Sequence, residues 1–284
     1  MKRSKLFSGI AAIALAAAVF SGCQKEKDIE LDEKAVSRDN AYAEKVFENV
    51  GDIANEAYDM GSGNYLKSYP GNRIFLSDCA TVTLDTNVFP YKLTIDFGDE
   101  NCLCLDGKYR RGQIIITFNG RYRHPSTIIT HTLQDYFVND KSIVGTKVVT
   151  NMGENDNGNL YFTIEISGIV QRPDDEGTFT YNSSREREWI QGSDTGNPWD
   201  DIYLLTGTAS GTRPSGLSWE QEITSPLRLE LACRFIVMGT IEIRPQDRPV
   251  RILDYGTGEC DNIATVTVNG QTYTIYLEDR KSVV

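Results

Sequence analysis

The sequence predicts an all-β protein, an antiparallel meander or β-sandwich preceded by a flexible tether and one N-terminal helix. Three observations carry this prediction. Most of the chain alternates apolar and polar residues with the period of two that strands require. Gly and Asn interrupt the alternating runs at short intervals, which favours hairpins over parallel crossovers. One stretch near the N-terminus has the three-to-four-residue spacing of an amphipathic helix.

The first 22 residues have the pattern of a signal peptide. Lys2, Arg3 and Lys5 form a positive segment, an uncharged apolar run extends over residues 6–20, and Cys23 follows two small residues. The run is shorter than the roughly 20 residues of a membrane-spanning helix, so we expect it to be removed. The segment ending at Cys23 resembles the lipobox of bacterial lipoproteins, which implies lipidation of Cys23 and a membrane-anchored mature chain.

A tether and a helix follow the expected anchor. Residues 23–36 are rich in charge and poor in large apolar groups, so they cannot offset the entropy of ordering and are predicted to be flexible. Residues 37–62 change to a helical period, with Val46, Val50 and Ile53 on one apolar stripe. We expect this helix to pack on the β domain or to act as a stalk.

Residues 70–284 form the predicted β domain, either as one unit or as two similar halves, 70–170 and 171–284. The segment from Leu160 to Ser167 alternates strictly, as a half-buried strand does. Turn-forming residues directly precede it. Further alternating runs lie at residues 81–84, 93–97, 114–118, 128–138, 202–207 and 227–243.

The end of the chain contains the clearest hairpin pattern. Asn269 and Gly270 tolerate positive φ and favour a two-residue type I′ turn. Such a turn places Val268 opposite Gln271, and it pairs the alternating apolar residues on one face of both strands. The sequence therefore predicts both the hairpin and its register.

A short internal repeat organises the cysteines. The pattern Asp-aromatic-Gly-x-x-x-Cys ends at Cys102 and again at Cys260. Each copy follows another cysteine in a strand-like run, Cys79 in the first case and Cys233 in the second. In an oxidising compartment we expect the bridges Cys79–Cys102 and Cys233–Cys260.

This pairing leaves Cys104 as an unpaired thiol. Cys104 lies two residues after Cys102, so it could replace Cys102 in the bridge to Cys79, remain free, or join two molecules. A metal site needs further Cys or His ligands, and the chain has only His124 and His131. The sequence therefore predicts no metal and no cofactor.

Motifs for catalysis are weak. The Asp-Phe-Gly triplet at residues 96–98 has neither the glycine-rich loop nor the catalytic loop of a kinase. Ser126, His131 and Asp135 lie close together without a nucleophile elbow, and His131 and Asp135 share one alternating strand. We therefore predict a protein that is not an enzyme.

One loop has the composition of a ligand site. Exposed tryptophans beside carboxylates can stack on sugars or bind calcium, although a Trp that caps a core edge and Asp residues that form turns have the same pattern. The candidate residues are Trp189, Asp194, Trp199, Asp200 and Asp201.

The charge of the chain limits its partners. The formal net charge is −11, and removing the leader, which carries three basic and no acidic residues, takes it to −14. So acidic a protein repels phosphate backbones, and nucleic acid is excluded as a partner. The expected partners are the membrane, through the lipid anchor, and a glycan or another envelope protein.

The features combine into a resemblance to a family. The lipobox, the helix, the repeat and the closing run from Asp254 to Ala264 resemble β-rich lipoproteins of Bacteroidota, a family without an assigned activity. The resemblance implies a lipid-anchored outer-membrane protein at the cell surface or on the periplasmic face. We expect a non-enzymatic binding or structural role. The first alternative is a glycan-binding or adhesin module, and the second is an enzyme acting on polysaccharide or envelope substrates, which would need two carboxylates across a cleft.

Overall fold

The computed structural model describes residues 42–58, 60, 75–171, 177–233 and 235–277. The predicted leader, Cys23, the tether and the start of the predicted helix lie outside the described residues. The all-β prediction is confirmed, because one helix, over residues 42–58, precedes an array of antiparallel strands. No helix in the described part of the chain is long and apolar enough to cross a membrane.

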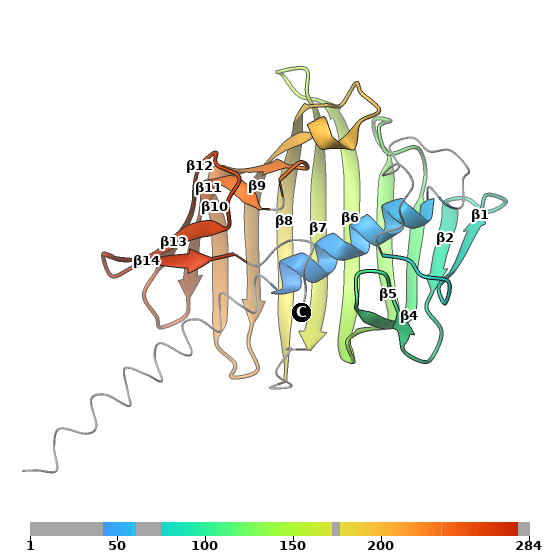
Figure 1. Cartoon of the computed structure of the whole chain (residues 1–284), viewed down its shortest axis with the longest axis horizontal. Helices are drawn as coiled ribbons and strands as arrows, with labels where there is room; N and C mark the ends of the chain where they lie inside the picture. The colour runs from blue at the N-terminus through green and yellow to red at the C-terminus, as the bar shows by residue number, and fades with distance from the viewer. Residues whose placement is uncertain (1–41, 59, 61–74, 172–176, 234, 278–284) are drawn as a thin grey trace, which may run out of the picture. The chain divides into compact units, whose positions relative to one another are not determined.

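The strands form one antiparallel meander (Figure 1). Each strand pairs with the strands before and after it in the chain, except that the short β3 pairs only with β4, which β2 also contacts. The strands are β1 (Thr81–Asp85), β2 (Tyr91–Asp96), β3 (Cys102–Leu103), β4 (Tyr109–Phe118), β5 (Ile128–Val138), β6 (Lys141–Glu154), β7 (Leu160–Gln171), β8 (Thr178–Gln191), β9 (Ile202–Thr212), β10 (Ser218–Glu230), β11 (Ile236–Pro245), β12 (Arg251–Thr257), β13 (Ile263–Val268) and β14 (Gln271–Tyr276); a short 3-10 helix, η1 (Pro198–Asp200), lies between β8 and β9.

The two predicted halves of the β domain join in a single sheet. β7 and β8 flank the expected boundary and pair along the whole of β7, from Leu160 opposite Trp189 to Gln171 opposite Thr178. Of the two architectures predicted from the sequence, the structure is therefore the meander. The local pattern is the same for both, because a period of two says which residues share a face and not which strand pairs with which.

The two faces of the sheet differ in composition, and β7 shows the difference. Phe162, Ile164 and Val170 are buried on one face, while Glu165 and Ser167 are exposed on the other. Gly168 belongs to the buried face, since a Cβ added there would lie 2.4 Å from Cζ of Phe47 in the helix. We call the helix-covered side the inner face and the opposite side the outer face.

The helix crosses the strands of the inner face (Figure 1). Glu44 near its start contacts Arg185 on β8, the Phe47 carbonyl accepts from Lys147 on β6, and Asn49 accepts from Arg110 on β4. The apolar stripe predicted from the sequence is buried, including Val50 and Ile53. Of the two roles expected for the helix, packing on the β domain is the one observed.

Several local predictions are confirmed. Val268 pairs with Gln271, as the two-residue turn at Asn269 and Gly270 requires, and both turn residues have positive φ. The repeat builds the same turn twice: the Gly98 N–H donates to Asp96 over 2.8 Å, and the Gly256 N–H donates to Asp254 over 2.9 Å. Both glycines have φ near +80°, which explains why each copy needs glycine at this place.

The cysteines are arranged as the repeat predicts. Cys79 is bridged to Cys102 and Cys233 to Cys260. Cys104 is a free, buried thiol, so of its three alternatives the structure shows the unpaired one. Each bridge fixes the turn after one strand to a segment more than 20 residues earlier, and the loop-entropy model assigns each about 3–4 kcal/mol of stability.

Candidate functional site

The outer face carries a groove that crosses six neighbouring strands, β6 to β11. Its floor consists of two adjacent rows of side chains, in which each residue stands opposite the next across the sheet. We call this region the outer-face groove. The first row is Thr146, Ser167, Asn182, Ser210, Glu220 and Arg244, and the second is Val148, Glu165, Ser184 and Thr208.

The groove is hollow because the central side chains are short. Between β7 and β9 both rows consist of Ser, Thr and Asn apart from Glu165, whereas long side chains, Glu220 and Arg244, stand at the β10–β11 end. The hollow has a volume of about 580 Å³. Six strands spaced about 4.8 Å apart give it a length of about 24 Å. This shape suits an extended chain that lies across the strands.

Hydrogen bonds within the groove leave capacity for a ligand. The Ser167 hydroxyl donates to Asn182 Oδ1 over 2.9 Å, and the Ser184 hydroxyl donates to Glu165 Oε1 over 2.6 Å. A serine oxygen that donates once can still accept, and the Asn182 amide nitrogen is a donor. These four side chains are exposed, so the floor offers both donors and acceptors to solvent.

Carboxylates dominate the charge at one end of the groove. Arg244 donates to Glu222 over 2.9 Å and to Glu242 over 2.7 Å, and these hydrogen bonds raise the pKa of its guanidinium. Glu220 stands opposite Arg244, and Glu165 lies further along the floor. The single arginine is thus shared between two acids, and the groove disfavours anionic ligands.

The residues of the ligand loop predicted from the sequence fall into an exposed group and a buried group. Trp199 in η1 is 40 % exposed and Asp194 is exposed, as expected. Trp189 is only 2 % exposed, because it belongs to β8 and packs against Tyr203 with ring centroids 5.4 Å apart. Asp201 is buried as well and accepts a hydrogen bond from the Tyr203 hydroxyl.

The expected exposed aromatic loop is therefore corrected to a single exposed ring. Asp200 accepts from the Thr195 hydroxyl over 3.0 Å, which makes it part of the turn. In this loop the interpretation as core edge and turn formers holds for Trp189, Asp200 and Asp201. The local composition could not show this, since the burial of Trp189 depends on its partner strand.

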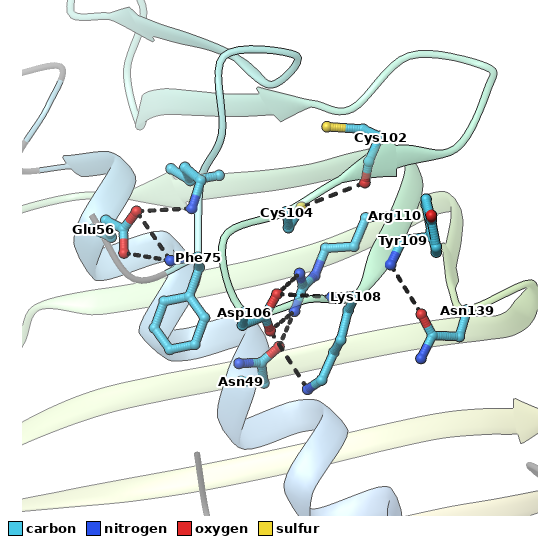
Figure 2. A network of polar contacts seen from close by, with 11 residues as sticks. Asn49, Glu56, Phe75, Cys102, Cys104, Asp106, Lys108, Tyr109, Arg110 and Asn139 are labelled. Atoms are coloured by element: carbon cyan, nitrogen blue, oxygen red, sulfur yellow. Dashed lines mark hydrogen bonds and ion pairs between the residues drawn. The ribbon is translucent and has the colours of Figure 1, made fainter. Parts of the chain in front are cut away.

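A second cluster of polar residues lies between the helix and β4 (Figure 2). Arg110, whose side chain is 0 % exposed, donates two hydrogen bonds of 2.7 Å to Asp106 and one of 2.8 Å to Asn49 in the helix. Lys108 lies 3.6 Å from the same carboxylate. Cys104 is buried beside this group, and it donates weakly to the Cys102 carbonyl (Figure 2). We call these residues the helix–sheet network.

Burial and charge shift the pKa values in the helix–sheet network. Burial lowers the pKa of Lys108 to about 8, although Asp106 opposes the shift. Burial alone would raise the pKa of Asp106, but the hydrogen bonds and charge of Arg110 bring it below its ordinary value. Burial raises the pKa of the Cys104 thiol, so this cysteine is a poor nucleophile. The network holds the helix on the sheet through the hydrogen bonds of Arg110 to Asn49 and Asp106.

Other buried cations on the inner face also meet the helix. Glu44 accepts hydrogen bonds from Arg185, Tyr181 and Gln221. Lys147 donates to the Phe47 carbonyl over 3.0 Å, and burial lowers its pKa to about 8. The inner face is thus already occupied by the chain's own acidic helix.

Comparison with protein families, with curated proteins and with solved structures finds no match. Among the described residues, no group of three or more His, Cys, Asp and Glu side chains is arranged to hold a metal ion. The sequence reasoning missed the outer-face groove, because its residues come from six strands and none forms a motif. The polar run Asn182-Ser183-Ser184 in the middle of a strand is the one local signal that points to it.

Proposed function

We propose that this protein is a lipid-anchored envelope protein that binds a neutral, hydroxyl-rich chain, a glycan, in the outer-face groove. The observation that carries the proposal is the double row of short polar side chains across β6 to β11. An outer face that only needed to be soluble would carry long charged side chains at these positions. Short hydroxyl and amide groups instead form an accessible floor of hydrogen-bonding groups.

The chemistry of the floor matches that of a sugar chain. Sugar hydroxyls both donate and accept hydrogen bonds, as do the Ser and Thr hydroxyls and the Asn182 amide. Successive strands repeat these groups about every 4.8 Å, a spacing close to the length of one pyranose unit. A linear glycan lying across the strands would meet a similar set of partners at each step.

The charges at the groove narrow the ligand class. Glu165 and Glu220 line the groove, and Arg244 is engaged by two further carboxylates. An anionic polymer would be repelled, so the glycan is neutral. Trp199 does not line the groove, and stacking on its ring is not part of the proposal.

The test is a glycan-array screen with the purified full chain, followed by calorimetric titration with the best neutral oligosaccharide. Ser210→Trp fills the floor on β9, and we expect it to weaken binding at least about tenfold, because the indole ring would cover the floor and the sugar hydroxyls would lose their hydrogen-bond partners there. Thr94→Trp is the matched control. Thr94 lies on the outer face of β2, three strands away from β6 in the sheet and outside the groove, and its replacement should leave affinity unchanged.

Salt dependence separates a neutral glycan from a cationic ligand. Binding of a neutral chain should be nearly the same at low and high ionic strength, whereas a basic peptide held by Glu165 and Glu220 would dissociate as salt rises. If no neutral glycan binds, or if Ser210→Trp and Thr94→Trp bind the glycan with equal affinity, the proposal is wrong.

The anchor has a separate test. Growth with a fatty-acid probe should label the full chain, and Cys23→Ser should abolish the label while leaving the β domain folded. An unlabelled wild-type chain would contradict the proposed lipid anchor. It would leave the proposal of glycan binding in the outer-face groove unaffected.

A further inference from the structure

Among the described residues the sheet ends at β14, and this strand lacks the features that protect exposed strands. Edge strands usually carry Lys or Pro, bulges or inward-pointing charges, which prevent pairing with another chain. β14 has none of these, and its pairing with β13 runs without a bulge. The opposite edge strand, β1, ends in the charged residue Asp85. Within the described residues, β14 pairs only with β13, and no strand pairs with its other edge (Figure 1).

The hairpin that forms this edge carries no charge and has large exposed aromatic side chains. Residues 263–276 contain no Asp, Glu, Lys or Arg, in a chain in which 24 % of residues are charged. Tyr273 is 54 % exposed and Tyr276 is 73 % exposed. A partner for this surface must therefore be an uncharged strand with apolar side chains, and β14 itself has these properties.

The direction of the backbone groups fixes which residues can pair. The Leu277 N–H donates to the Asn262 carbonyl, so the residues of β14 in the same alternation, 271, 273 and 275, also bond to β13. The N–H and C=O groups of Thr272, Thr274 and Tyr276 then point away from the sheet. The edge thus presents three donors and three acceptors.

We propose that two copies of this protein associate through antiparallel pairing of β14 with β14, around a two-fold axis at Thr274. In this register Thr274 of one copy stands opposite Thr274 of the other, and Thr272 stands opposite Tyr276. All three outward-facing residues of each strand then pair, which forms six main-chain hydrogen bonds. If the register shifts by two residues in either direction, one outward-facing residue of each copy is left without a partner.

The side chains support the same register. On the inner face Tyr273 of one copy meets Ile275 of the other, an aromatic and β-branched pair that stabilises antiparallel strands. On the outer face the threonine row, in which Thr265 stands opposite Thr274, continues into the second copy. The lack of charge on β14 and the match of its side chains to those of a second copy favour a second copy over an unrelated peptide.

Cysteine cross-linking tests the proposed register. Hydrogen-bonded antiparallel residues have Cα atoms about 5.5 Å apart, within the range that a disulfide bridges. Thr274→Cys should therefore form a covalent dimer under mild oxidation of the full chain in detergent. Thr265→Cys is the matched control: it lies one strand further in, and the two copies of this residue would be about 14 Å apart. Both variants also carry Cys23→Ser and Cys104→Ser, because Cys104 is a free thiol, so that only the introduced thiol can form the cross-link.

A second variant tests the association without cross-linking. Thr274→Pro removes an N–H that does not bond to β13, so the hairpin stays intact while pairing at the two-fold axis is blocked. Sedimentation velocity should show a wild-type dimer whose dissociation constant rises at least about tenfold in this variant. A monomeric wild-type chain at all concentrations, or equal cross-linking of Thr274→Cys and Thr265→Cys, would overturn the proposal.

Discussion

The inner and outer faces of the sheet use the same strands for opposite purposes. On β8 the inward residues Tyr181, Arg185 and Trp189 are buried, while the outward residues Asn182 and Ser184 are exposed. The inner face gains stability from large side chains and from buried cations that bond to the helix or, in the case of Arg110, also to Asp106 before β4. The outer face leaves its polar groups available. The comparison teaches that one alternating strand can carry the core on one side and the binding surface on the other.

The largest expected effect is on the apolar part of the inner face. Phe162 is fully buried and stacks on Tyr122 with ring centroids 4.7 Å apart. Phe162→Ala should lower the free energy of unfolding by about 3–5 kcal/mol in denaturant titration, because it leaves a cavity. The neighbouring outward residue Thr163, changed to Ala, should stay within about 0.5 kcal/mol of wild type. Equal losses would show that the outer face is also packed.

The second-largest loss of folding stability is expected in the helix–sheet network. Asp106→Ala leaves the buried Arg110 guanidinium without its carboxylate, which should cost about 3 kcal/mol, at the lower end of the range for buried ion pairs. The outer-face pair supplies the comparison. Glu222→Ala removes one of two carboxylates from the exposed Arg244, and its unfolding curve should overlay that of wild type. A large loss in Glu222→Ala would contradict the division between the faces.

A smaller expected effect on folding stability depends on pH and involves the buried His131. His131 is buried on the inner face, where burial and Lys147 lower its pKa to about 3, and its Nδ1 lies 3.2 Å from the Lys147 carbonyl. The unfolded chain has a histidine pKa of about 6.5, so between pH 6.5 and 3 it binds a proton that the folded chain does not. The stability from neutral His131 is therefore present above pH 6.5 and lost as the pH falls towards 3.

The measurement compares variants across this pH range. His131→Phe should lose less stability than wild type between pH 6.5 and 4, a difference of about 2–3 kcal/mol at most. Parallel curves for wild type and His131→Phe would mean that His131 is protonated in the folded protein.

Much of the local structure could be predicted from the sequence. The alternation at Leu160–Ser167, the turn at Asn269 and Gly270 and the repeat with its two bridges depend on contacts near in the chain or on a pattern that occurs twice. β8 was missed as a strand, because its centre reads Asn-Ser-Ser-Arg-Glu-Arg-Glu and lacks the apolar alternation on which the prediction depends. Two arginines occupy inward positions where an apolar residue would be expected. Arg185 bonds to Glu44 in the helix, and Arg187 packs against aromatic rings, among them that of Phe162.

The sequence by itself determined the class of the fold and the faces of individual strands, because both depend on the period of two and on short-range turn chemistry. The repeat predicted the two bridges, but only the structure decided that Cys102 and not Cys104 is bridged to Cys79. Only the tertiary structure decided that the strands form one meander and that Trp189 and Asp201 are buried. It also decided that ten outward-facing residues from β6 to β11, in two adjacent rows, form a groove. The physical reason is that register between strands brings together residues far apart in the chain, and no local pattern records which strands become neighbours.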